Sequence, residues 1–318
     1  MANASRFGFA STTDEVLEGI DLSGKAALVT GASGGLGEET ARALAAHGAS
    51  VAMTARDLPR GEAAAEKIRN STGNTNVEVI ELELDSLASV RKCADGYVAS
   101  HDRLDLLINN AGVMACPFGK TQDGFEQQFG TNHLGHFVLT NRLMPVLLAG
   151  APGRIINLSS GGHRASNVLF NDPNFETTDY DKFVSYGQSK TANILFSVEL
   201  DRRLADRGIR SFAVHPGAIV TDLGRHMQPA DIEQMMSSAP AGTRLEFKQV
   251  ASGAATTCYA ATSSDLDGRG GLYLEDCGVA EVLDEDAMEG VCSYALDAEA
   301  AQRLWTLSEQ LVGERFDL

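Results

Sequence analysis

Short apolar runs alternate with longer amphipathic runs along this chain from about residue 25 onward. The short runs have the length and composition of buried strands, whereas the longer runs carry apolar residues at helical spacing. The predicted strands are Lys25–Thr30, Ser50–Thr54, Val77–Glu81, Leu104–Ile108, Arg154–Leu158, Ile209–Val214 and Gly271–Leu274. Strands that alternate with crossover helices form a parallel sheet covered on both faces. The pattern therefore predicts an α/β fold with a doubly wound parallel sheet of about seven strands.

The longer runs predict the helices that connect these strands. They are Glu38–His47, Gly61–Asn70, Leu87–Ser100, a long helix within Gly124–Leu148, Tyr186–Leu204, a helix near Lys248–Ala261 and a final one near Ala298–Leu311. No internal repeat, low-complexity tract or linker divides the sequence. We therefore predict an N-terminal extension over residues 1–23 and a single domain over 24–318, with a substrate loop or lid at about 216–245.

Composition narrows the class of partner. The 318 residues are 43% hydrophobic, which is ample for a buried core. The net charge of −17 argues against a nucleic-acid partner, because the phosphate backbone is also negatively charged. We interpret the excess of acidic residues as a means of keeping the protein in solution. No apolar run is long enough to span a bilayer, and the N-terminus lacks the pattern of a signal peptide. We expect a cytoplasmic protein with a small-molecule partner.

Cysteine and histidine usage gives no sign of a metal. The five cysteines are scattered without a CxxC motif, which fits reduced thiols better than a disulfide framework or a zinc site. His133 and His136 lie at helical spacing, but no acidic ligand motif such as HExxH accompanies them. No metal is predicted.

Polar or glycine-rich clusters follow five of the predicted strands directly. They are TGASGGLG (Thr30–Gly37), Ala55 with Arg56, NNAG (Asn109–Gly112), SSGG (Ser159–Gly162) and HPG (His215–Gly217). In an open parallel sheet, ligands bind beyond the carboxyl ends of the strands, and all five clusters lie at that edge. Together they predict a ligand cleft there.

The first cluster has the features of a phosphate-binding turn. Gly31, Gly35 and Gly37 lead from a strand into a helix, where a pyrophosphate would meet bare backbone and the N–H groups of the helix. An ordinary glycine-rich turn is the alternative, although the flanking strand and helix favour the dinucleotide interpretation. No GK[ST] follows, so a P-loop is excluded.

The end of the second strand indicates which dinucleotide is bound. An acidic residue there would hold a ribose 2′-hydroxyl, but this chain has Ala55 and Arg56. A guanidinium can grip a 2′-phosphate, so NADP(H) is favoured over NAD(H). Alternatively, Arg56 pairs with Asp57 or Glu62 on the surface. Asp85, just past the third strand, would contact an adenine edge or cap the next helix.

A tyrosine and a lysine lie one helical turn apart in YGQSK. Tyr186 and Lys190 share one helix face at this spacing, as an acid and the cation that tunes it would. Spacing alone would also fit two residues on a helix surface, but the other motifs at the same sheet edge favour the acid and its cation. The free phenol titrates near 10. A nearby ammonium and a positively charged nicotinamide ring would both lower this pKa toward the working range.

With these motifs assembled, the chain resembles the short-chain dehydrogenase/reductase superfamily over about Lys25 to Leu274. The resemblance rests on TGASGGLG, NNAG, TNHLGHF, NLSS, YGQSK and HPGAIVT. TARD, NLSSGGHR and YGQSKTANILF are most similar to the branch of retinol dehydrogenases and WW-domain oxidoreductases, although no WW domain precedes the fold here. The resemblance implies a Rossmann-type sheet, oxidoreductase chemistry and assembly into homodimers or homotetramers.

The resemblance also implies roles for individual residues. Tyr186 would be the general acid in carbonyl reduction and the base in alcohol oxidation, and Lys190 would hold the nicotinamide ribose and lower the tyrosine pKa. Ser160 would hydrogen-bond the substrate oxygen, and Asn132 would keep a water that links Lys190 to solvent. The implied cofactor-binding residues are Gly31, Ser33, Gly35, Leu36, Gly37, Arg56, Asp85, Asn110, Ala111, Gly112, Tyr186, Lys190, Pro216, Gly217, Ile219 and Thr221.

Two of these roles have simple alternatives when the residues are considered alone. Ser159 could replace Ser160 beside the substrate, and either serine could serve only a turn or a helix cap. A polar residue within a long helix, such as Asn132, often bonds only a nearby carbonyl.

Three segments outside the motifs have open roles. The aromatic residues Phe170, Phe175, Tyr180 and Phe183 either wall an apolar pocket or pin a long loop. Met227, Met235 and Met236 suit a mobile lid over a bulky substrate or, alternatively, one buried helix stripe. The acidic segment Asp284–Gly290 and the final helix serve packing or subunit contact.

The sequence therefore predicts an NADP(H)-dependent oxidoreductase that interconverts an alcohol and its aldehyde or ketone, with a bulky apolar substrate. The alternative from another class is a non-catalytic NADP(H)-binding sensor or scaffold of the same fold. A sugar-nucleotide epimerase or dehydratase would share the tyrosine and lysine, but its usual GxxGxxG spacing and longer C-terminal domain do not match this chain.

Overall fold

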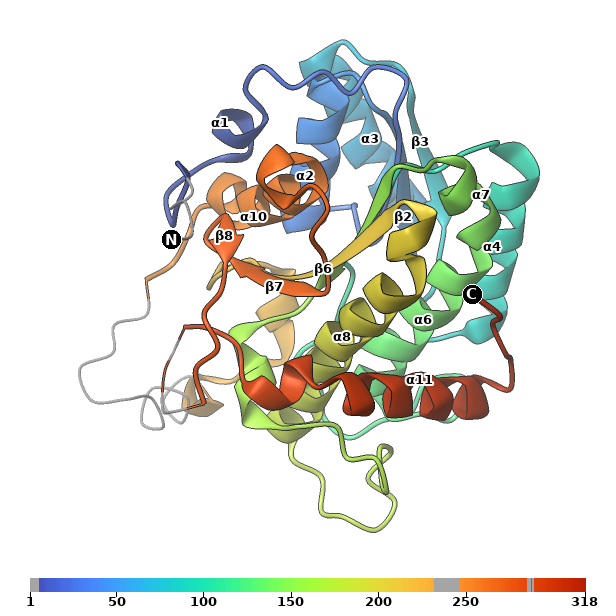
Figure 1. Ribbon diagram of the computed structural model, residues 1–318, viewed down its shortest axis with the longest axis vertical. Helices are drawn as coiled ribbons and strands as arrows, with labels where there is room; N and C mark the ends of the chain where they lie inside the picture. Colours follow the sequence, from blue (N-terminus) through green and yellow to red (C-terminus); the bar gives the residue numbers. More distant parts are fainter. Residues whose placement is uncertain (1–5, 232–245, 285–286, 288) are drawn as a thin grey trace.

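Eight strands form one sheet in the computed structural model, which describes residues 6–231, 246–284, 287 and 289–318 (Figure 1). The strands are β1 Ala26–Val29, β2 Ser50–Ala55, β3 Val77–Glu81, β4 Leu106–Asn109, β5 Gly153–Leu158, β6 Ile209–His215, β7 Leu272–Glu275 and β8 Gly278–Val279. They lie in the order β3-β2-β1-β4-β5-β6-β7-β8. The first seven run parallel, and the predicted single-domain, doubly wound α/β fold is confirmed.

The eighth strand is an addition to the predicted set. It pairs antiparallel with β7 after a tight turn in which Asp276 and Cys277 adopt positive φ angles of 46° and 57°. Because β8 is only two residues long, it shows no alternation of apolar and polar positions, and the sequence pattern could not predict it.

The order of the strands places the ligand cleft. The chain moves from β1 outward to β3, then returns to β4 beside β1 and continues outward in the opposite direction to β7. This reversal between β1 and β4 is the topological switch point, where open parallel sheets bind ligands beyond the carboxyl ends of the strands. The glycine turn after β1 and NNAG after β4 meet at this point.

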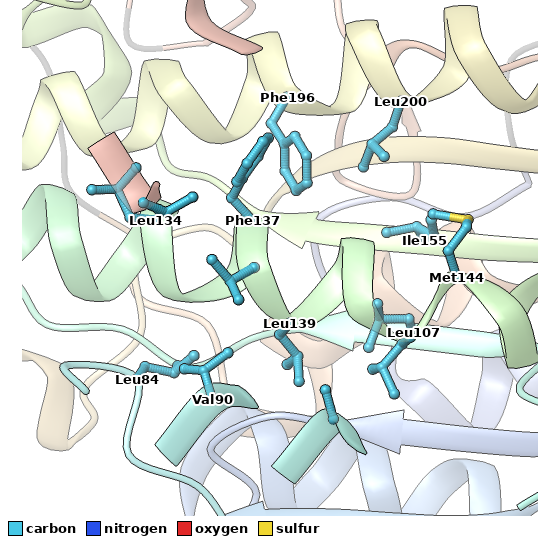
Figure 2. Packing of buried hydrophobic residues seen from close by; sticks show 14 of the residues in the cluster. Leu84, Val90, Leu107, Leu134, Phe137, Leu139, Met144, Ile155, Phe196 and Leu200 are labelled. Atoms are coloured by element: carbon cyan, nitrogen blue, oxygen red, sulfur yellow. The ribbon is translucent and has the colours of Figure 1, made fainter. Parts of the chain in front are cut away.

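Helices cover both faces of the sheet (Figure 1). They are α1 Thr13–Leu17, α2 Gly35–Ala46, α3 Leu58–Thr72, α4 Leu87–Ser100, α5 Gln127–Phe129, α6 Gly135–Arg142, α7 Met144–Ala149, α8 Lys182–Leu204, α10 Val250–Thr262 and α11 Ala298–Val312. Because strand side chains alternate, Leu28 faces the core layer under α4, α6 and α8, whereas Ala27 and Val29 face the layer under α2 and α10. In the first layer, Phe137 of α6 meets Phe196 of α8 with ring centroids 5.4 Å apart (Figure 2).

Several helix boundaries differ from the predicted ones for local reasons. The side chain of Asp181 accepts hydrogen bonds from two backbone N–H groups and starts α8 at Lys182, before Tyr186. The side chain of Asp57 likewise starts α3 at Leu58. The long helix expected within Gly124–Leu148 is divided into α5, a π-helical turn η1 (Gly130–Leu134), α6 and α7.

Residues 6–23 pack against the domain. Helix α1 begins with a capping box between Thr12 and Glu15, and its Val16 and Leu17 join the core layer beneath α2 and α10. Arg42 of α2 forms an ion pair with Asp14 at 2.7 Å. This part of the chain therefore covers one edge of the α2–α10 layer.

The final helix packs inside the same chain. Trp305 of α11 lies 5.0 Å from Phe137 and 6.0 Å from Phe196 between ring centroids, and it is only 3% exposed. The hydroxyl of Ser308 hydrogen-bonds Nε2 of His133 at 2.8 Å. The sequence left open whether this helix serves packing or subunit contact, and the structure shows that it packs within its own chain. Among the helices that the structure describes, none is long and apolar enough to cross a membrane.

Candidate active site

The glycine turn and NNAG are locked together at the switch point. Asn110 donates from Nδ2 to the carbonyl of Thr30 at 2.7 Å, and the Thr30 hydroxyl accepts from the backbone N–H groups of Asn110 and Ala111. Gly31 has φ of 65°, and a Cβ there would lie 2.8 Å from Cβ of Ala111. A Cβ on Gly37 would lie 2.5 Å from Nδ2 of Asn110. These glycines let two loops approach more closely than side chains would permit.

The same turn presents the N-terminus of α2 to the cleft. Gly34 is the N-cap of this twelve-residue helix and supplies no side-chain hydrogen bond to it. Backbone N–H groups at such an end attract an anionic group. The turn therefore fits the pyrophosphate of a dinucleotide.

The loop after β6 reaches the glycine turn. Pro216 follows the last residue of β6, and Gly217 has φ of 92°. A Cβ on Gly35 would lie 3.6 Å from Cγ2 of Thr221, whereas Ile219 and Leu36 meet at Gly253 of α10. The predicted nicotinamide-side residues thus lie beside the predicted phosphate turn.

Tyr186 and Ser160 meet at the carboxyl end of β5. Tyr186 is 6% exposed, and Ser160 is the polar neighbour that lowers the pKa of its phenol. Gly162 fits between them, because a Cβ there would lie 2.8 Å from the tyrosine ring and 3.4 Å from Oγ of Ser160. The hydroxyl of Ser159 donates instead to the backbone carbonyl of Lys190 at 2.9 Å. Geometry therefore brings the second serine, Ser160, to the phenol.

Lys190 lies beneath the same phenol. Its Nζ is 5.5 Å from the centroid of the Tyr186 ring and donates to the carbonyl of Leu158 at 3.1 Å. A Cβ on Gly112 would come within 3.7 Å of this Nζ, which connects Lys190 with NNAG. Burial lowers the pKa of Lys190 to about 8.

Burial raises the pKa of Tyr186 to about 12 in the protein alone, and Ser160 only partly offsets this effect. Desolvation of a phenolate outweighs the favourable groups around it in this state. The phenol is therefore a protonated acid at neutral pH. The predicted lowering also depended on a positively charged nicotinamide ring beside the phenol, so it stays a prediction for the protein with its cofactor.

Asn132 is held by the π-helical turn η1. Its Oδ1 accepts from the backbone N–H of Val113 at 2.8 Å, and its Nδ2 donates to the carbonyl of Val113 and to Oγ of Ser189. Oδ1 also lies 3.1 Å from the position of a Cβ on Gly112, the glycine that Lys190 approaches. Asn132 thus ties NNAG to α8 near Lys190. Single-turn π-helical insertions are frequent at functional sites.

The two residues predicted to contact the adenosine part of the cofactor lie in the loops that follow β2 and β3. Arg56 follows β2 and is exposed. The carboxylates proposed as its alternative partners have other contacts, since Asp57 caps α3 and Glu62 pairs with Arg69 at 3.4 Å. Asp85 does not cap α4, because Ser86 is the N-cap. The capping alternative for Asp85 is wrong.

Most of the aromatic insert pins its loop to the body. Phe170 packs against the main core beneath the guanidinium of Arg303, and Phe175 is 6% exposed. Tyr180 donates from its hydroxyl to the carbonyl of Cys116 at 2.9 Å, whereas Phe183 is half-buried beneath Lys182. The pinning alternative therefore describes Phe170, Phe175 and Tyr180.

The predicted lid is described only as far as residue 231. Asp231 forms an ion pair with Lys182 at 2.6 Å, which ties this segment to the first residue of α8. Met227 is half-buried, whereas Met235 and Met236 lie outside the described residues. His133 and His136 are buried in the core, and the described parts of the chain contain no cluster of three or more histidine, cysteine or acidic side chains that could hold a metal.

Sequence reasoning missed two glycines that set the position of the phenol. Gly162 faces the Tyr186 ring, and a Cβ on Gly187 would lie 2.9 Å from the carbonyl of Gly162. These glycines let α8 pack tightly against the 3-10 helix η2 (Gly161–Ala165). The adjacent small residues in SSGG and YG are the only sequence signal of this contact.

The chain belongs to the short-chain dehydrogenase family, whose model matches residues 25–231. Its members act on CH–OH groups with NAD(P). Retinol dehydrogenase 13 from Mus musculus is 42% identical over 92% of this chain and 85% of its own length.

Two solved structures illustrate the similarity. A protein of unassigned function from Mycobacterium paratuberculosis is 36% identical, with a TM-score of 0.74 over 97% of this chain and all of its own. The RhlG/NADP active-site complex from Pseudomonas aeruginosa is 27% identical, with a TM-score of 0.62 over 80% of this chain and 95% of that one. The family resemblance read from the sequence is confirmed.

Proposed function

We propose that the protein is an NADP(H)-dependent oxidoreductase that interconverts a bulky apolar alcohol with its aldehyde or ketone. The observation that carries this proposal is the meeting of Ser160, Tyr186 and Lys190 at the sheet edge that also holds the glycine turn. A proton donor, a hydrogen-bond donor and a cation are the groups that carbonyl reduction requires.

Each side chain has a distinct part in this reaction. When bound, NADP(H) would be the donor or acceptor of the hydride at the carbinol carbon. Ser160 donates a hydrogen bond to the substrate oxygen, and Tyr186 gives that oxygen its proton during reduction or removes it during oxidation. The ammonium of Lys190 stabilises the phenolate that forms as the proton leaves. Asn132 is a positioning residue, because it fixes Val113 and α8 around Lys190.

The preference for NADP(H) rests on the end of β2. Ala55 and Arg56 stand where a carboxylate would select a ribose 2′-hydroxyl, and Arg56 is exposed at the cleft edge. The related RhlG complex contains NADP.

Replacing Arg56 with aspartate is expected to weaken NADPH binding by at least about tenfold, since a charge-assisted hydrogen bond to the 2′-phosphate is lost and repulsion is added. NADH binding should change far less. Fluorescence titration of each reduced cofactor measures both. An unchanged ratio of NADPH to NADH affinity in this variant would show that Arg56 does not contact the 2′-phosphate.

The substrate class is proposed from the similarity to retinol dehydrogenase 13. A screen of retinoid, steroidal and aromatic carbonyl compounds, with consumption of NADPH and NADH followed by absorbance, tests the proposed activity. Turnover of at least one bulky apolar compound with NADPH is expected. No turnover of any compound by wild type, together with tight NADPH binding, would favour a sensor or scaffold.

The rate of carbonyl reduction is expected to fall as pH rises through about 8. Lys190 has a lowered pKa of about 8 and loses its ammonium first, whereas Tyr186, at about 12, keeps its proton. The lost cation raises the cost of forming the phenolate. A profile of kcat/KM against pH measures this, and the inflection should disappear in Lys190→Met. If the inflection near pH 8 persists in Lys190→Met, a group other than Lys190 causes it.

A further inference from the structure

An ion pair joins two segments 162 residues apart at the adenosine end of the cleft. Nη2 of Arg60 lies 2.6 Å from Oδ2 of Asp222. Arg60 lies in the first turn of α3, four residues after Arg56, and Asp222 directly follows Thr221 and begins the 3-10 helix η4 (Asp222–His226). We call this pair the clasp.

The clasp crosses the glycine turn. On one side, Nε of Arg60 donates to the carbonyl of Ser33 at 3.3 Å, and a Cβ on Gly34 would lie 2.9 Å from Nη2 of Arg60. On the other side, Thr221 lies over Gly35, with 3.6 Å between its Cγ2 and the position of a Cβ. The clasp therefore spans the part of the cleft that fits the phosphates of the cofactor.

Arg60 is suited to a second anion besides Asp222. It is 55% exposed and lies beyond the carboxyl end of β2, where the adenosine ribose of a dinucleotide binds in this kind of sheet. Glu38 and Asp57 also act on Arg60 electrostatically, but Asp222 is the carboxylate that contacts its guanidinium and contributes most to its raised pKa. Asp222 is therefore the group that competes with an incoming anion for Nη2 of Arg60.

We propose that the 2′-phosphate of NADP(H) competes with Asp222 for Arg60, which makes Asp222 a determinant of cofactor affinity. This inference rests on the proposed use of NADP(H). An exposed carboxylate–guanidinium pair contributes little, whereas a phosphate offers more charge and bidentate geometry. Phosphate binding thus opens the clasp and frees η4 from Arg60.

Two ligands that differ only in the 2′-phosphate test the proposal without any hydride chemistry. Adenosine 2′,5′-bisphosphate and 5′-AMP are titrated by calorimetry at low salt into wild type, Asp222→Asn, Arg60→Gln and the double variant. Removing the competing carboxylate is expected to tighten bisphosphate binding by about two- to fivefold, the range of one exposed ion pair. Binding of 5′-AMP should stay within about twofold.

The double variant tests whether the effect passes through Arg60. Arg60→Gln should weaken bisphosphate binding by about tenfold, and most of the gain from Asp222→Asn should disappear in its presence. Glu62→Gln is the matched control, because it removes one negative charge from α3 at a residue that pairs with Arg69 instead. If Glu62→Gln tightened bisphosphate binding as much as Asp222→Asn does, the change in net charge alone would explain the effect, and the proposed role of the clasp would be overturned.

The outcomes separate this inference from the proposed cofactor. If wild type binds the bisphosphate no more tightly than 5′-AMP, the NADP(H) preference itself fails. If the preference exists and depends on Arg56, but Asp222→Asn changes nothing or changes both ligands equally, the clasp alone is overturned.

Discussion

Replacing Tyr186 with phenylalanine is expected to lower kcat for carbonyl reduction by about 10²- to 10⁴-fold, the usual contribution of a positioned general acid. Phenylalanine keeps the ring that fills the space beside Gly162 and removes only the hydroxyl that meets Ser160. The fold and NADPH binding should therefore persist. Steady-state kinetics with a substrate from the carbonyl screen, together with NADPH titration, measure both quantities.

The result discriminates catalysis from cofactor sensing. A variant that binds NADPH normally but turns over slowly identifies the phenol as the proton donor. Equal turnover by wild type and Tyr186→Phe would show that another group supplies the proton and would end the proposed mechanism. Tyr180→Phe is a matched control, since it removes a half-buried hydroxyl that donates to the carbonyl of Cys116 outside the reacting centre.

Replacing Gly162 with alanine is expected to lower kcat by about 10²-fold, because a shift of about 1 Å in a reacting group can have this effect. The added Cβ would lie 2.8 Å from the ring of Tyr186, closer than carbon atoms approach, so the ring must move relative to Ser160. NADPH binding should change little, because a Cβ on Gly162 would meet Tyr186 and Ser160 rather than the glycine turn or NNAG.

The control for this variant is Gly96→Ala in α4. A Cβ there would meet nothing within 4 Å, so the same chemical change occurs in open space. We expect unaltered kcat and slightly higher stability, because alanine favours a helix by about 0.5 to 1 kcal/mol over glycine. Thermal unfolding checks that both variants are folded. Wild-type kcat in a folded Gly162→Ala would show that this glycine does not hold the phenol in place.

Tyr186 has one property that the sequence displays and another that only the fold decides. Its position beside Lys190 follows from helical spacing, which the sequence displays directly. Its pKa depends on how much water the surrounding loops exclude, and burial raises that pKa to about 12. Desolvation is a property of the packed molecule, so no local pattern could give its direction here.

The sequence by itself determined the seven parallel strands, the sheet edge at which the motifs gather and the identity of the groups that meet there. Strand alternation, glycine turns and helical spacing are local consequences of backbone geometry, so they can be read along the chain. Tertiary structure decided which of Ser159 and Ser160 faces the phenol, where Arg60 finds a partner 162 residues away, and whether the aromatic insert lines a pocket or anchors a loop. These outcomes depend on close packing between distant segments, which only the folded chain brings into contact.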